Sequence, residues 1–188
     1  MIAMGDPGTK APLSLEELDA AVGLRTGRKH VLSILVENRP GVLTRIAGLF
    51  ARRGFNIETL TVGPTDDEQF SRITLTVDGA LHPIDQVTKQ LHKLVNVLKI
   101  RDLEPGGTVT RELALFKVAA EGTARSELLE YSEIFRGRVV DTSRRSLTIE
   151  VTGSSDKIAA FERVVRPYGL VEMMRTGEIA MSRGRTET

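Results

Sequence analysis

Apolar residues recur along this chain with two alternating periods, one typical of strands and one typical of helices. Val31 to Val36 is an almost continuous apolar run, as in a strand that is buried on both faces. Apolar positions from Leu43 to Phe50 then have helical spacing up to Gly54. Continued in this way, the pattern predicts strands at 30–37, 55–63, 70–79 and 97–103, with helices from about Pro40 to Gly54 and at 84–95.

The same order of periods returns in the second half. Residues 104–108, Glu-Pro-Gly-Gly-Thr, have the composition of a linker. Beyond them the pattern predicts strands at 109–120, 138–143, 146–153 and 170–177, with helices at 124–137 and 154–169. Two βαββαβ units indicate an α+β fold of two tandem ferredoxin-like modules. Each would have an antiparallel sheet with its helices on one face and the other face left for a partner.

The chain therefore divides into three predicted segments. Residues 1–29 form an N-terminal extension that is expected to be partly disordered, with a short helix at about 14–22. The first module is expected at 30–104 and the second at 105–188. Each module is near the lower size at which a single core is stable by itself, so the two are expected to associate.

Composition narrows the class of protein. Hydrophobic residues make up 40% of the 188 residues and charged residues 27%, which is typical of a soluble globular protein. A formal net charge of +1 and 4% aromatic residues give no support for a nucleic-acid partner. The absence of cysteine excludes disulfides and thiolate metal sites and suits the cytoplasm. No apolar run is long enough for a membrane span.

The loop between the first strand and the first helix has the chemistry of a binding site. A helix that begins near Pro40 leaves the N–H groups of Gly41 and Val42 without helical acceptors, and these groups favour an anion such as a carboxylate. Gly41 lets a ligand approach the backbone, and Asn38 adds both donors and an acceptor. An alternative interpretation is ordinary turn and capping geometry, which also explains Asn56 before the second strand.

A family resemblance favours the binding interpretation. The segment "SILVENRPGVLTRIAGLFARRGFNIETLTVGPTDD" resembles the most distinctive stretch of the ACT domain in the small, regulatory subunit of acetolactate synthase (acetohydroxyacid synthase). The likeness continues through "QVTKQLHKLVNVLKI", "RELALFKV" and "EIFRGRVVD" to a terminal "SRG". It extends from about His30 to Gly184, so only residues 1–29 lie clearly outside it.

The resemblance implies a non-catalytic chain with a defined partner. Such a subunit binds the catalytic large subunit, raises its activity and makes it sensitive to a branched-chain amino acid, most often valine. Thiamine diphosphate, Mg²⁺ and FAD are then expected on the catalytic partner, and no cofactor on this chain. Paired ACT domains imply a homodimer with the effector at its interface. Carried over by position, the effector-binding residues are Asn38, Gly41, Val42, Asn56 and Ile57.

Other polar groups do not indicate chemistry of their own. The histidines at 30, 82 and 92 lack the spacing of a metal site and are expected on the surface or beside helices. Asp66, Asp67 and Glu68 are expected in an exposed turn, so no metal is predicted. No nucleophile and base occur in a catalytic arrangement. The remaining alternatives are a free-standing amino-acid sensor and a transcriptional regulator built from the same module.

Overall fold

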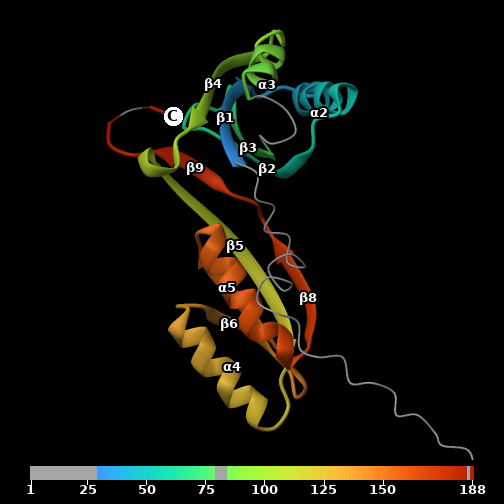
Figure 1. The fold of residues 1–188 in the computed structure, drawn as a ribbon, viewed down its shortest axis with the longest axis vertical. Coiled ribbons are helices and arrows are strands. Elements are labelled where there is room, and N and C mark those ends of the chain that lie inside the picture. Colours follow the sequence, from blue (N-terminus) through green and yellow to red (C-terminus); the bar gives the residue numbers. More distant parts are fainter. Residues whose placement is uncertain (1–28, 79–83, 186) are drawn as a thin grey trace, which may run out of the picture.

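The computed structural model describes residues 29–78, 84–185 and 187–188, and its elements form two antiparallel sheets (Figure 1). The first sheet has the strand order β2-β3-β1-β4, and the second has the order β6-β7-β5-β8 with β9 paired to β5. This arrangement confirms the predicted α+β class and the two βαββαβ units.

Elements of the first half are β1 (Lys29–Glu37), α2 (Val42–Arg53), β2 (Ile57–Pro64), β3 (Phe70–Asp78), α3 (Ile84–Leu91) and β4 (Val97–Leu103). Elements of the second half are η1 (Pro105–Gly107), β5 (Thr108–Ala119), α4 (Thr123–Ile134), β6 (Arg138–Thr142), β7 (Ser146–Gly153), α5 (Ser155–Val165), η2 (Arg166–Tyr168), β8 (Leu170–Arg175) and β9 (Ile179–Ser182). The predicted helix at 14–22 lies outside the described residues. The predicted helix at 84–95 ends at Leu91, and a turn follows it.

Each sheet has a core on the face that its helices cover. In the first half, alternate residues of β1 and β3 pack against α2 and α3, and this core contains Leu32, Ile34, Val36, Ile46, Phe50, Ile73, Leu75, Val77, Val87 and Leu91. In the second half, Phe116 of β5 lies 5.0 Å from Phe161 of α5, centroid to centroid, in an edge-on contact. Both rings are fully buried. The buried residues of the two halves form separate clusters, and most of their side chains are aliphatic.

The second half is not a simple repeat of the first. Strand β5 extends beyond its sheet, and its first residues pair with β9, from Thr108 with Ser182 to Arg111 with Ile179. Figure 1 shows β9 returning beside β5 toward the first sheet. The sequence pattern missed β9 because its four residues lie between glycines and have a partner far away in the chain. The apparent linker is the short η1 turn that leads directly into β5.

The helix-free face of the first sheet is partly covered by the chain itself. Arg72 Nη1 donates to Thr188 O at 2.7 Å and to Ser33 Oγ at 3.0 Å across this face. Ser33 and Thr74 are 2% and 4% exposed although they point away from the apolar core. This burial could not be predicted from the sequence, because polar residues on a covered face look like exposed ones in the hydrophobic pattern.

His30 also differs from its predicted surface position. It lies in β1, where its side chain is 16% exposed and its Nδ1 is 2.8 Å from Asp102 Oδ2 of β4. The first and last strands of the module bring the pair together. His82 lies outside the described residues. No helix within the described ranges is long and apolar enough to span a membrane, and no three acidic or histidine side chains there are grouped to hold a metal ion.

Candidate effector site

The loop after β1 leaves the start of α2 without a side-chain cap. Gly41 is the N-cap residue with a left-handed φ of 84°, and it makes no side-chain cap hydrogen bond. The first turn has no acidic residue, so nothing in it neutralises the positive end of the helix dipole. The Val42 N–H lies 3.4 Å from Arg39 O, which is a long and weak hydrogen bond. This helix end is therefore suited to bind a carboxylate.

Gly41 and Val42 contribute in different ways. Gly41 is exposed, and an added Cβ there would have no atom within 4 Å, so a ligand has room to approach its backbone. Val42 is 6% exposed, and its side chain belongs to the first core. Only the backbone N–H of Val42 can therefore face a ligand.

Asn38 connects this loop to the turn between β2 and β3 by two hydrogen bonds. Its backbone N–H donates to Gln69 O at 2.7 Å, and its Nδ2 donates to Glu68 O at 3.0 Å. These bonds are the structural role that the turn-geometry alternative predicted. Since a carboxamide has two N–H donors and an acceptor, Asn38 is able to hold the turn and still contact a ligand.

A polar network beside the loop was not predicted from the sequence. Asn96 donates to Glu37 Oε2 at 2.6 Å and accepts from Arg45 Nη1 at 3.0 Å. Arg45 belongs to the first turns of α2, so its guanidinium adds positive charge near the helix end. The signal in the sequence was an arginine near the start of a helix, where acidic residues are usually favoured.

Asn56 and Ile57 lie at the other end of the first sheet. Ile57 pairs with Val77, and Val77 pairs with His30 at the start of β1, whereas Asn38 follows the last residue of β1. The strand from His30 to Glu37 spans about 23 Å at about 3.3 Å per residue. Asn56 is exposed, and Ile57 is partly buried against the first core. One chain therefore does not bring the two groups of candidate residues together.

Strand β2 lies at the edge of the first sheet. Within the described residues, β2 pairs only with β3 and forms one side of the first sheet.

Comparison with known proteins agrees with this architecture. Residues 32–99 match the model of the AHAS small subunit-like ACT domain, and residues 111–184 match the model described as the small subunit of acetolactate synthase. These two matches include all five candidate effector residues but leave residues 1–31 unmatched.

Individual relatives resemble nearly the whole chain. It is 53% identical over 156 residues to the probable acetolactate synthase small subunit of Methanothermobacter thermautotrophicus, covering 82% of this chain and 93% of the relative. It is 51% identical to the acetolactate synthase small subunit of Mycobacterium leprae, covering 87% and 95% respectively. The crystal structure of the acetolactate synthase small subunit from Thermotoga maritima superposes with a TM-score of 0.78 at 41% identity, covering 85% of this chain and 99% of that one. The chain belongs to the acetolactate synthase small-subunit family.

Proposed function

We propose that this chain is the regulatory subunit that binds and activates the catalytic subunit of acetolactate synthase and makes it sensitive to valine. The observation that supports this function best is the uncapped start of α2 beside Asn38, inside a domain that matches the family's ACT model. We assign no reaction step to this chain. Thiamine diphosphate, Mg²⁺ and FAD are expected on the catalytic partner.

The loop supplies the groups that an amino-acid effector needs. The N–H groups of Gly41 and Val42 would bind the effector carboxylate, with the positive end of α2 and the Arg45 guanidinium adding to the attraction. Asn38 and Asn56 would bind the remaining polar atoms. An apolar pocket distinguishes side chains that differ by one methylene by only about 1–3 kcal/mol, so leucine and isoleucine should compete with valine.

We propose further that the effector site is shared between two chains that pair through their ACT domains. Asn38 and Asn56 lie at opposite ends of the sheet in one chain, and antiparallel pairing of two β2 edges places them at the same end. A two-fold dimer of this kind would contain two identical effector sites. Valine bound there would favour one dimer geometry over another, and that preference would be the source of inhibition.

A complementation experiment tests the shared site. Asn38→Ala and Asn56→Ala chains should each lose valine binding and inhibition but retain activation, because neither residue lies in a core. Co-refolding equal amounts makes about half of the dimers mixed, each with one intact site, so about a quarter of the wild-type binding capacity should return. Isothermal titration calorimetry with valine measures this capacity.

Two controls make the result decisive. Asn38→Ala chains refolded alone by the same procedure should recover no valine binding. A wild-type sample refolded in parallel defines the full binding capacity. Recovery in the mixed sample requires that the two residues act across the interface. If the mixed sample binds no valine while wild type does, the proposal of a shared site is wrong. If wild type neither activates the catalytic subunit nor responds to valine, the regulatory function itself is wrong.

A further inference from the structure

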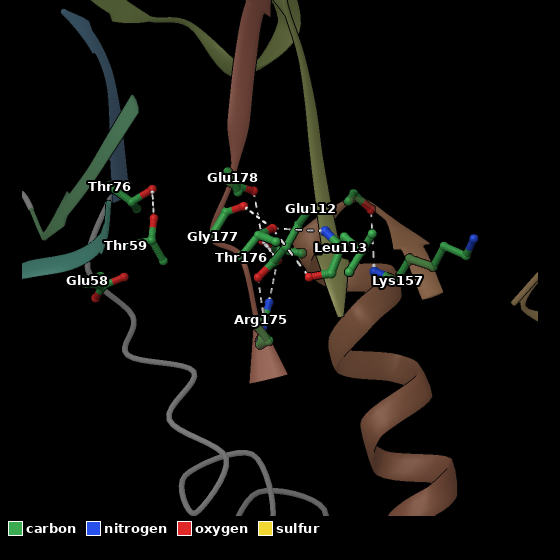
Figure 2. Close-up of polar contacts among 12 residues, drawn as sticks. Glu58, Thr59, Thr76, Glu112, Leu113, Lys157, Arg175, Thr176, Gly177 and Glu178 are labelled. Atoms are coloured by element: carbon green, nitrogen blue, oxygen red, sulfur yellow. Dashed lines mark hydrogen bonds and ion pairs between the residues drawn. The ribbon is translucent and has the colours of Figure 1, made fainter. Parts of the chain in front are cut away.

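One turn of the second half packs directly on strand β2 of the first (Figure 2). The turn consists of residues 175–178, from the last residue of β8 to the residue before β9. Thr61 Oγ1 donates to Thr176 O at 3.2 Å. Gly177 has a φ of 81°, and a Cβ added to it would lie 3.1 Å from both Thr59 Cβ and Thr61 Oγ1. A side chain at residue 177 would be strained by this φ and would push against both threonines, so the turn and the strand are in close contact.

The second half fixes the same turn with buried polar contacts. Arg175 Nε and Nη2 donate to the two oxygens of Glu112 at 2.7 and 2.6 Å, and the Glu112 side chain is only 1% exposed. Thr176 N–H donates to Leu113 O at 3.0 Å. A bidentate pair of this kind defines position and orientation together. A movement of the turn is therefore transmitted to β5.

The turn is also connected to the start of helix α5. Ser155, the first residue of α5, has its Oγ 2.9 Å from Glu112 Oε2 and 2.8 Å from Glu178 Oε1. A hydroxyl has a single hydrogen, so it donates to one of these carboxylates at a time. The Ser155 hydroxyl therefore has two alternative acceptors, and one of them, Glu178, belongs to the turn.

The turn lines a cleft of about 870 Å³ between the two halves, together with residues such as Lys29, Thr108 and Ala159. The two halves are therefore not packed continuously here. The turn bridges them next to the strand that begins at Ile57.

We propose that the turn formed by residues 175–178 couples strand β2 to helix α5, so that the second half of the chain takes part in the response to the effector. This inference rests on the proposed function, since it assumes that valine binds at the start of β2. Valine would stabilise one position of β2. Through the contact at Gly177, β2 would then fix the position of the turn. The contact between Glu178 and Ser155 would in turn fix the start of α5.

The test compares two glycine substitutions. Gly177→Ala introduces a side chain against Thr59 and Thr61, whereas Gly184→Ala places one at a similar φ of 74° with no atom within 4 Å. Both variants have left-handed strain, but only the first disturbs β2. We expect Gly177→Ala to bind valine within about threefold of wild type and to activate normally. Its valine concentration for half inhibition should rise about tenfold, the size of a typical allosteric coupling. Gly184→Ala should match wild type.

A second variant covers the case in which Gly177→Ala does not fold. Thr61→Val removes the hydroxyl that donates to Thr176 O and keeps the side-chain shape, so inhibition should weaken in the same direction by about threefold. Hydrogen exchange of the α5 amides supplies a readout without the enzyme. Valine should change their protection in wild type and Gly184→Ala but much less in Thr61→Val or a folded Gly177→Ala.

The outcomes separate this proposal from the one on which it rests. If both β2-contact variants are inhibited like wild type, the turn is not the link, and the regulatory function stands. If Gly177→Ala and Thr61→Val lose valine binding together with inhibition, the turn supports the binding site and does not couple it. If wild type binds no branched-chain amino acid, both proposals fail.

Discussion

Replacing Arg175 with methionine should destabilise the second half through a single buried carboxylate. Methionine keeps much of the aliphatic volume but removes both hydrogen bonds to Glu112, which is 1% exposed at its side chain. Ser155 Oγ still lies 2.9 Å from Glu112 Oε2 in the wild-type geometry, and the Gly177 N–H also bonds to this carboxylate. The variant therefore leaves Glu112 buried and only partly compensated.

The size of the effect follows from these contacts. Removing one partner of a fully buried ion pair costs about 3–5 kcal/mol. The Arg175 side chain is 31% exposed, the Gly177 N–H still bonds to Glu112, and Ser155 can donate to it, so we expect a smaller loss of about 2–3 kcal/mol. For a chain of 188 residues this corresponds to a decrease in Tm of about 5–10 °C.

The loss should depend on pH in a defined direction. Burial opposes ionisation of Glu112, but the hydrogen bonds from Arg175 and Ser155 and the Arg175 charge outweigh it and hold its pKa below the ordinary value of 4.5. In wild type this stabilisation is present above pH 4.5 and is lost as the pH falls through the lowered pKa. Without Arg175, its hydrogen bonds and its charge no longer lower the pKa of Glu112. The stability difference between wild type and variant should thus be largest at neutral pH and shrink in acid.

Urea denaturation followed by circular dichroism, at pH 7 and at a series of lower pH values, measures this difference. Lys117→Met is the matched control, because it breaks an exposed pair in which Lys117 and Glu172 are 43% and 60% exposed. It should cost less than about 1 kcal/mol at any pH. A loss in Arg175→Met no larger than in this control, or one that grows in acid, would refute the reasoning.

Two further substitutions test the packing and the capping of the second half. Phe116→Ala removes a ring that is fully buried against Phe161 and should cost about 3–5 kcal/mol, measured as a lower urea midpoint. Ser154→Ala removes the N-cap of α5, whose oxygen accepts from Lys157 N–H at 3.4 Å; because that bond is long, the loss should be only about 0.5–1 kcal/mol, measured as a small decrease in Tm.

Much of the fold could be predicted from the sequence because buried and more exposed residues alternate along strands that form the cores. Ala114, Phe116 and Val118 alternate with exposed or half-exposed neighbours, and this pattern located β5. Glu112 lies two residues before Ala114 and continues this alternation as a buried residue. The pairing of Glu112 with Arg175 could not be predicted, because the two residues meet through strand pairing between distant segments.

The candidate site could be predicted only in part. The Asn38–Gly41 loop is local, and local turn and helix geometry determines it. Asn96 and Arg45 joined it only through the tertiary fold. The position of Asn56 at the opposite end of the sheet follows from strand order, which periodicity alone does not specify.

The most direct measurement is the rate of acetolactate formation by the cognate catalytic subunit, with and without this chain, across a valine titration. A regulatory subunit with an intact effector site should raise the rate, and valine should lower it again toward the rate of the catalytic subunit alone. An unchanged rate on adding the chain, at every valine concentration, would contradict the proposed function.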